Sequence, residues 1–257
     1  MAGPAFLSLP ERRHKPRSGG LTHVLDKGAS LAATESVLQS AAAHIDIWKV
    51  GWGIAYVDAA LPAKLALLAA ADVRSCLGGT LLEIAWAQGK DEQCLDWALE
   101  AGFDCVEVSR GVVPMPVGDK HALLARAAER FVVLSEVGSK DPRAHAAPAE
   151  WTREVAGDLR AGAAWVITEG RESGTVGLYR SDGSVREELL AAVLQGAGPD
   201  RLFFEAPRKD QQAWLIRELG PDVNLANVAL DDALALETLR LGLRADTAEL
   251  SCQQVPV

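Results

Sequence analysis

The sequence has few cysteines, and no two of them form a C-x-x-C pair. Cys76, Cys94, Cys105 and Cys252 are scattered along the 257 residues. This spacing excludes a zinc ribbon and a disulfide framework. We therefore expect reduced thiols, as in a cytoplasmic protein. Cys105 has no histidine placed to activate it, so a buried structural thiol is the favoured interpretation.

An excess of basic residues and a long apolar run are also missing. The formal net charge is −9, which disfavours binding to nucleic acid or to an anionic membrane. The most apolar stretch, Ala59 to Ala71, is interrupted by Pro62 and Lys64 and is too short to span a bilayer. Residues 1–20 carry charged side chains with no apolar segment behind them, so no signal peptide is expected. These features predict a cytoplasmic protein without a membrane anchor.

The composition nevertheless allows a large packed core, because 49% of the residues are apolar and 24% are charged. No linker rich in proline or serine divides the chain. We expect one domain over residues 1–257, with an N-terminal extension (1–20) and a C-terminal tail (248–257).

Short β-rich runs alternate with longer amphipathic stretches at the spacing typical of β-α units. Several runs lack polar alternation, as strands covered on both faces do. This pattern predicts an α/β protein with a single (β/α)8 TIM barrel. The alternative is a doubly wound open sheet, but the glycine-rich dinucleotide loop typical of that fold is missing. The expected strands are Leu21–Asp26, Ile45–Gly51, Val73–Leu77, Cys105–Ser109, Phe131–Glu136, Trp165–Glu169, Leu202–Glu205 and Val223–Asn227.

Charged and polar residues stand at or just after the ends of these runs. In a barrel of this type the active site lies at the carboxyl ends of the strands, so these side chains should converge there. Charged residues are rarely buried unless they are paired or ligated. The set is Asp26, Lys27, Lys49, Glu107, Ser109, Arg110, Glu136, Lys140, Glu169, Arg171, Ser173, Gly174, Glu205, Asn224 and Asn227.

Several carboxylates at one end of a barrel would repel one another without a cation among them. Mg²⁺ prefers oxygen ligands and often bridges to a substrate carboxylate or phosphate. We therefore predict a magnesium site held by Asp26, Glu136, Glu169 and Glu205. Lys27, Lys49, Lys140 and Arg171 would attract an anionic substrate, and a lysine in such a cavity can also donate a proton.

Backbone N–H groups between Gly170 and Gly174 could bind phosphate oxygens. We therefore assign substrate binding to Lys27, Arg171, Ser173, Gly174, Asn224 and Asn227. His23, His121 and His145 lack the spacing of metal ligands, and structural or solvated roles are favoured for them.

The sequence resembles the phosphosulfolactate synthase family, which acts at the start of coenzyme M biosynthesis and has bacterial and plant relatives. The matching segments occur in family order from residue 6 to about residue 247. They include Leu25-Asp26-Lys27-Gly28, Lys49-Val50-Gly51-Trp52-Gly53, Gly78-Gly79-Thr80-Leu81, Glu136-Val137-Gly138-Ser139-Lys140, Arg171-Glu172-Ser173-Gly174 and Phe204-Glu205-Ala206-Pro207.

The resemblance implies a TIM barrel that adds sulfite to phosphoenolpyruvate and depends on Mg²⁺. The product would be 2-phospho-3-sulfolactate. The proton donor proposed for the family is the lysine of its E-V-G-x-K motif, which is Lys140 here. We expect Lys140 and Lys49 to be catalytic. The resemblance also implies a homo-oligomer, for which a trimer is one candidate.

The sequence departs from the family pattern at a few positions. Ile54 stands where the family usually has Thr or Ser, and Arg110 stands where it has Asp or Asn. A cation at a strand end could change the preferred anion. Two alternatives therefore stay open: a barrel enzyme that uses another nucleophile or enol phosphate, and a non-catalytic member with a binding or stress role.

Overall fold

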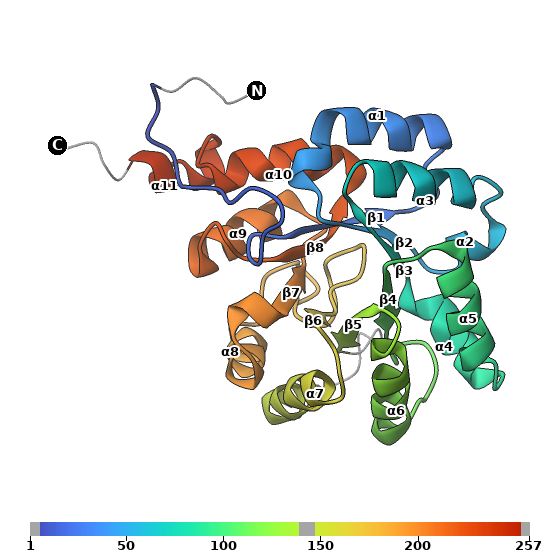
Figure 1. Cartoon of the computed structure of the whole chain (residues 1–257). Helices are drawn as coiled ribbons and strands as arrows, with labels where there is room; N and C mark the ends of the chain where they lie inside the picture. The colour runs from blue at the N-terminus through green and yellow to red at the C-terminus, as the bar shows by residue number, and fades with distance from the viewer. Residues whose placement is uncertain (1–5, 139–146, 253–257) are drawn as a thin grey trace.

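The computed structural model describes residues 6–138 and 147–252, and within them eight parallel strands close into a barrel. Helices surround the strands (Figure 1), so the predicted (β/α)8 barrel is confirmed. Neighbouring strands are consecutive in the chain, and β8 pairs with β1 to complete the ring. The strands are β1 (Thr22–Asp26), β2 (Ile47–Val50), β3 (Arg74–Leu77), β4 (Cys105–Val108), β5 (Val132–Val137), β6 (Trp165–Thr168), β7 (Leu202–Glu205) and β8 (Leu225–Ala229).

The helices pack on the outer surface of the barrel, and local signals fix some of their ends. Ser30 accepts a hydrogen bond from the backbone N–H of Ala33 and begins the first helix. Gly102 ends α5 with a φ of 94°, a left-handed conformation that favours glycine. The helices are α1 (Leu31–Ala41), α2 (Ile54–Val57), α3 (Leu61–Ala70), α4 (Gly79–Ala87), α5 (Asp91–Ala101), α6 (Val117–Ala128), α7 (Pro148–Arg160), α8 (Glu187–Gly196), α9 (Lys209–Leu219), α10 (Ala233–Arg240) and α11 (Glu249–Cys252), with 3₁₀ turns at Ala42–His44, Pro199–Arg201, Leu230–Asp232 and Ala245–Thr247.

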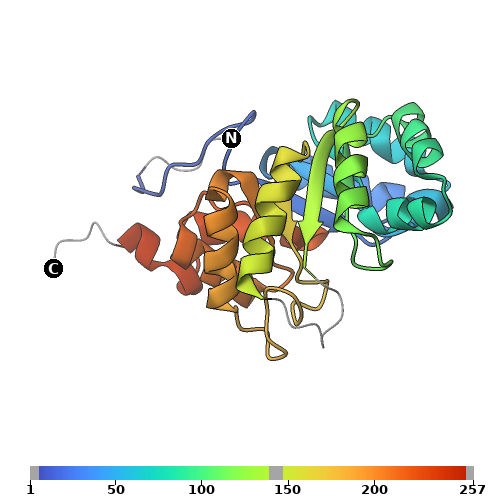
Figure 2. The same ribbon diagram turned by 90° about the horizontal axis from the view of Figure 1, so that it is seen from below.

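Two apolar layers stabilise the barrel. One lies between the strands and the helices, and Figure 2 shows β5 between α6 and α7 there. The other fills the barrel interior with one side chain from each strand or its start: Leu21, Ile47, Cys76, Cys105, Leu134, Ile167, Phe203 and Ala226. Cys76 and Cys105 are free and fully buried, as predicted for Cys105. A packed interior of this kind leaves the ends of the strands as the place for a site.

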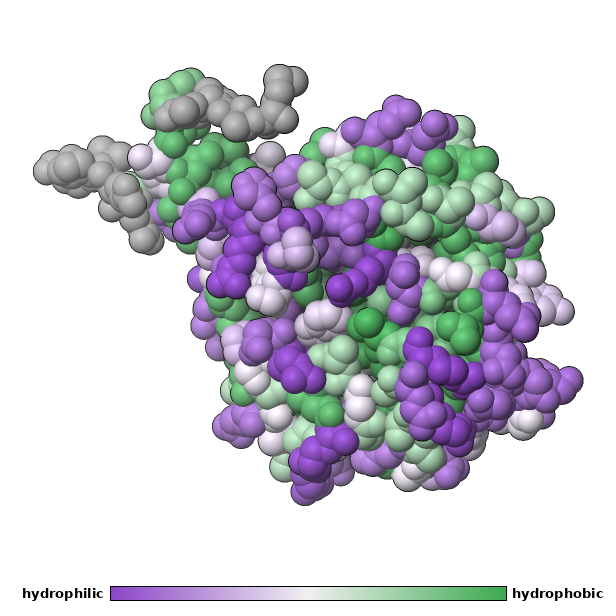
Figure 3. All heavy atoms as spheres, in the orientation of Figure 1, coloured by the Kyte–Doolittle hydropathy of each residue, from purple (hydrophilic) through white to green (hydrophobic). Residues whose placement is uncertain are grey.

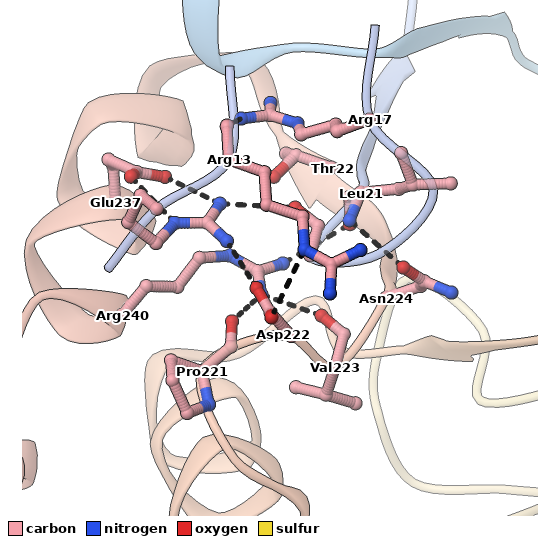
Figure 4. A network of polar contacts seen from close by, with 12 residues as sticks. Arg13, Arg17, Leu21, Thr22, Pro221, Asp222, Val223, Asn224, Glu237 and Arg240 are labelled. Carbon is pink, nitrogen blue, oxygen red and sulfur yellow. Dashed lines mark hydrogen bonds and ion pairs between the residues drawn. The ribbon is translucent and has the colours of Figure 1, made fainter. Parts of the chain in front are cut away.

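The segment before β1 closes the amino-terminal end of the barrel. Arg12 donates to Glu237 of α10, at 2.9 and 3.1 Å, and to the carbonyl of Gly20 at 3.1 Å. The fully buried guanidinium of Arg240 donates to the carbonyls of Pro221, Val223 and Leu21 (Figure 4). These contacts tie the segment to α10, and α10 to the residues that precede β1 and β8.

The outer surface is mixed in character. On the face in Figure 3, apolar residues gather over α3 and hydrophilic ones over α5 and α6. Arg126 and Arg130 of α6 pair there with acidic residues of α5. Within residues 6–138 and 147–252, no helix is long and apolar enough to cross a membrane.

Candidate active site

A cavity of about 330 Å³ opens at the carboxyl ends of the strands. Side chains that point into the barrel from β2, β4 and β5, or stand at the ends of β6 and β7, reach it. The lining residues are Leu25, Lys49, Trp52, Gly79, Thr80, Glu107, Val112, Glu136, Glu169, Arg171, Glu172, Glu205 and Asn227. The structure therefore brings together seven residues of the predicted set: Lys49, Glu107, Glu136, Glu169, Arg171, Glu205 and Asn227.

Lys49 of β2 and Glu107 of β4 form a buried ion pair in this cavity. Lys49 Nζ lies 2.6 Å from Glu107 Oε2, and Glu107 Oε1 accepts from the backbone N–H of Gly79 at 3.0 Å. Burial alone would lower the pKa of Lys49, but Glu107, Glu205 and Glu136 together raise it above its usual value. Lys49 therefore stays protonated and acts as a fixed positive charge.

The surroundings of Glu205 favour its uncharged form, whereas those of Lys49 favour the charged form. Burial raises its pKa to about 7, with Glu136 and Glu107 adding to the rise against the attraction of Lys49. Its Oε2 accepts from the backbone N–H of Gly170 at 2.7 Å, and its Oε1 accepts from Asn227 Nδ2. The carboxyl group is thus fixed in place by two donors.

Unusual backbone conformations cluster around the cavity. Trp52, Arg171 and Asn227 have φ values of 49°, 58° and 53°, in the left-handed region that side chains disfavour. All three line the cavity. Strained backbone of this kind is typical of functional sites, because the surrounding structure must hold it.

The loop between β6 and α8 holds Arg171 at the edge of the cavity. The backbone N–H of Arg171 donates to Glu169 Oε1 at 2.8 Å. Further along the loop, the buried Gln211 donates from Nε2 to the carbonyls of Gly174 and Gly183, at 2.7 and 3.1 Å. A Cβ atom at position 174 would lie 2.5 Å from Gln211 Nε2, so any side chain there would collide with this amide. The turn that carries Arg171 is therefore rigidly anchored.

Other predicted residues lie elsewhere. Asp26 is not brought to the cavity: Leu25 points inward, so Asp26 points outward and is fully buried. Its carboxylate accepts from Trp48 Nε1 and Lys64 Nζ, each at 3.2 Å. It also accepts from two backbone N–H groups, those of Gly28 and Ala29. These four donors leave it little capacity for a metal ion.

Asn224 also lies outside the cavity, since it directly precedes β8 at the end of the barrel opposite the cavity. Asn224 lies at the amino-terminal end of the barrel (Figure 4), where it accepts from the backbone N–H of Leu21 at 2.9 Å. Lys27 is exposed and does not line the cavity. Ser173 is paired with Thr175 at 2.8 Å, and Gly174 contacts Gln211 as described. Lys140 and His145 lie outside the described residues.

The two departures from the family pattern do not add charge to the cavity. Arg110 forms two hydrogen bonds with Glu154 of α7, at 2.9 and 3.1 Å, and does not line the cavity. Ile54 begins α2 and is not a lining residue. The expected change of anion preference from Arg110 therefore has no geometric basis here.

Two further side chains support the cavity, and neither was assigned a role from the sequence. Glu83 of α4 accepts from the backbone N–H groups of Gly111, Val112 and Val113, which shapes the loop that places Val112 at the cavity. Lys120 of α6 is fully buried and donates to the carbonyl of Glu136 at 2.8 Å. The sequence pattern could have indicated that Lys120 is buried, because it shares an otherwise apolar helix face with Leu123, Leu124 and Ala127.

The donor chemistry of the cavity suits a hard cation bound together with a ligand. Within the described part of the chain, no group of three or more His, Cys, Asp or Glu side chains is assembled as a metal cluster. Mg²⁺ does not need one, because it is commonly held by one or two carboxylates with substrate oxygens and water completing the shell. Glu136 and Glu169 line the cavity and carry oxygen donors of the kind that Mg²⁺ prefers. Both oxygens of Glu205 accept hydrogen bonds, from Gly170 and Asn227.

Comparison with known proteins decides the family. The model of the (2R)-phospho-3-sulfolactate synthase (ComA) family matches residues 10–246. The chain belongs to this family. The phosphosulfolactate synthase of Bacillus subtilis (strain 168) is 40% identical over 244 residues, which cover 94% of this chain and 97% of the relative. The phosphosulfolactate synthase of Methanothermobacter thermautotrophicus is also 40% identical, over 93% of this chain and 95% of the relative.

Solved structures agree with the fold of this phosphosulfolactate synthase family member. A 3-hexulose-6-phosphate synthase from Salmonella typhimurium superposes with a TM-score of 0.59 at 16% identity, covering 91% of this chain and 100% of that one. Another 3-hexulose-6-phosphate synthase gives a TM-score of 0.57 at 20% identity, over 86% of this chain and 97% of that one. At such low identity these matches support the barrel alone. The family match supports an enzyme that acts on small molecules.

Proposed function

We propose that this protein adds sulfite to phosphoenolpyruvate and forms 2-phospho-3-sulfolactate with the help of Mg²⁺. The observation that carries the proposal is the charge of the cavity in a member of the phosphosulfolactate synthase family. Among the described lining residues, five glutamates face two cations, Lys49 and Arg171. Two anionic substrates could not approach such a surface without a divalent cation, which lowers the local negative charge.

Mg²⁺, held by Glu136 and Glu169, would supply positive charge beside the substrate carboxylate. Arg171 would bind the phosphate, since a guanidinium forms paired hydrogen bonds to phosphate oxygens. Arg171 lines the cavity, and none of the hydrogen bonds between described residues involves its guanidinium. Lys49 would act as a fixed charge that stabilises the negative charge formed during the reaction.

The chemical step forms one bond and moves one electron pair. The sulfur lone pair of sulfite attacks the methylene carbon C3, and the π electrons of the double bond move toward C2 and the carboxylate. A proton delivered to C2, which we assign to the Lys140 ammonium, completes the addition. No bond to phosphate breaks, so the phosphoryl group is retained in the product.

The proposal is tested by incubating the protein with phosphoenolpyruvate, sulfite and Mg²⁺ while ³¹P NMR follows the phosphate resonance. We expect the enol phosphate signal to be replaced by that of an alkyl phosphate. If phosphoenolpyruvate is consumed with another nucleophile but not with sulfite, the protein catalyses a different addition reaction. No reaction with any small anion, together with no Mg²⁺ binding, would favour a binding role.

Replacing Arg171 by methionine should raise the KM for phosphoenolpyruvate about tenfold or more, because a charged hydrogen bond to phosphate contributes about 1.5–3 kcal/mol. Steady-state kinetics against phosphoenolpyruvate measure the change. Arg153→Met is the matched control, since Arg153 is an exposed residue of α7 outside the cavity. Equal KM values for both variants would remove Arg171 from phosphate binding.

Replacing Glu169 by glutamine should weaken Mg²⁺ binding about 10- to 100-fold, because the charge of a ligand is lost while its shape is kept. A titration of activity against Mg²⁺ at saturating substrate gives the half-saturating concentration. Glu100→Gln, on the exposed surface of α5, is the control. An unchanged titration in Glu169→Gln would contradict the assignment.

A further inference from the structure

His23 is a fully buried residue of β1 that lies inside the barrel close to the cavity. Its ring packs against Phe203 of the interior apolar layer, with ring centroids 6.0 Å apart. Its Nδ1 accepts a hydrogen bond from the backbone N–H of Asn227 at 3.3 Å. No hydrogen bond from a described residue reaches the buried Nε2.

This hydrogen bond fixes the protonation state of the imidazole. A ring nitrogen that accepts cannot carry a proton, so the hydrogen of neutral His23 lies on Nε2. Burial and the nearby charge of Lys49 lower the pKa of His23 well below its usual value, which keeps the ring neutral. His23 is therefore a permanent acceptor for the amide of Asn227.

Asn227 lies at an irregularity in β8 directly opposite His23. The pairing of β1 with β8 moves from Thr22↔Leu225 to Val24↔Val228, so β8 has one residue more than β1 over this interval. This is the geometry of a β-bulge, which often re-aims a side chain beside an active site. Asn227 adopts its left-handed φ of 53° there.

The bulge directs the carboxamide of Asn227 into the site. Asn227 lines the cavity, and its Nδ2 donates to Glu205 Oε1. Its buried Oδ1 has no hydrogen-bond partner among the described residues. A buried carbonyl oxygen without a donor is costly unless a ligand or water supplies one. The side chain thus fixes Glu205 and keeps one amide oxygen as an acceptor for a ligand or water.

We propose that His23 is a positioning residue, which holds the Asn227 bulge through its Nδ1 and thereby keeps the Asn227 carboxamide between Glu205 and the bound ligand. The inference rests on the proposed function for its kinetic consequences. Its structural part, the hydrogen bond that maintains the bulge, can be measured without turnover.

A pair of variants separates the hydrogen bond from packing. His23→Met keeps most of the buried volume and removes the acceptor, whereas His23→Asn places an amide oxygen near the position of Nδ1. We expect His23→Met to lower kcat/KM for phosphoenolpyruvate about 10-fold or more, in the range found when supporting residues of a site are removed. His23→Asn should stay within about threefold of the wild type. Equal losses in both variants would overturn the proposal.

A double-mutant cycle with Asn227→Gly tests whether His23 acts through Asn227. Glycine adopts a left-handed conformation without strain, so it does not need His23 to hold the bulge. His23→Met should therefore reduce activity by less than about threefold when residue 227 is already glycine. A full tenfold loss in that background would show that His23 acts by another route.

Two NMR readouts do not depend on turnover. Imidazole ¹⁵N shifts should show the Nε2–H tautomer of His23, and exchange of the Asn227 amide should be slow in the wild type and in His23→Asn but faster in His23→Met. Equal exchange in all three proteins would overturn the proposal. The protein could show these NMR results and yet not react with phosphoenolpyruvate and sulfite. That outcome would refute the proposed function, but it would still support the role of His23 in holding the bulge at Asn227.

Discussion

Replacing Lys120 by methionine is expected to lower the free energy of unfolding by about 3–5 kcal/mol, because it leaves the buried carboxylate of Asp158 without the ammonium group that balances its charge. Lys120 Nζ lies 2.7 Å from Asp158 Oδ2 and 3.0 Å from Glu154 Oε1, and its side chain is fully buried. Asp158 is also fully buried, and Ser135 Oγ is a further donor to it at 2.6 Å. His121 Nε2 also lies 3.2 Å from Asp158 Oδ1, but its ring is partly exposed, so neither group replaces the buried ammonium.

Denaturant unfolding of the purified variant measures this loss. Lys90→Met is the matched control, since Lys90 is exposed and should change stability by no more than about 0.5 kcal/mol. A double variant, Lys120→Met with Asp158→Asn, should recover part of the loss because the stranded charge is gone. A loss below about 1 kcal/mol in Lys120→Met would show that the ion pairs contribute little.

The same ion pairs connect stability to the candidate site. Lys120 donates to the carbonyl of Glu136 in β5, and α6 and α7 flank that strand (Figure 2). Burial would raise the pKa of Glu154, but Arg110 and Lys120 lower it below its usual value. Glu154 therefore contributes stability above the pKa of an unfolded glutamate, and this contribution is lost as the pH falls toward its lower folded-state value.

The fold was predictable because the signal repeats along the chain. Runs such as Phe131–Leu134 and Leu202–Phe204 are apolar without alternation, as strands covered on both faces must be. Eight β-rich runs at regular spacing, several of them without alternation, permit few arrangements other than a closed barrel. Glu107, Glu136, Glu169 and Glu205 then converged as expected, since parallel strands share one carboxyl end, whereas Asp26 did not.

The same lack of alternation explains why individual residues were misplaced. When both faces of a strand are buried, the sequence does not show which side chains point inward. Leu25 and Asp26 are both buried, yet only Leu25 lines the cavity. In β8 the bulge at Asn227 adds a residue, and the strand begins after Asn224. Neither the inward-facing side of a strand nor the bulge can be deduced from hydrophobicity alone.

Replacing Lys140 by alanine is expected to lower kcat about 10²- to 10⁴-fold, the range typical for loss of a general acid. The cations that line the described cavity are poor sources of the proton for C2. Lys49 is bound to Glu107 with its pKa raised, and a guanidinium such as Arg171 does not give up a proton at neutral pH. The lysine of the E-V-G-S-K segment after β5 is therefore the proposed donor.

Chemical rescue distinguishes proton donation from charge alone. Methylammonium added to Lys140→Ala should restore part of kcat in proportion to its concentration, because a small amine can occupy the space left by the side chain and deliver the proton. Lys140→Arg keeps the charge but should stay as slow as Lys140→Ala, since arginine cannot deprotonate. Activity of Lys140→Arg near that of the wild type would show that residue 140 contributes charge, and the proton would then have to come from another group, of which Glu205, with its pKa of about 7, is the first to test.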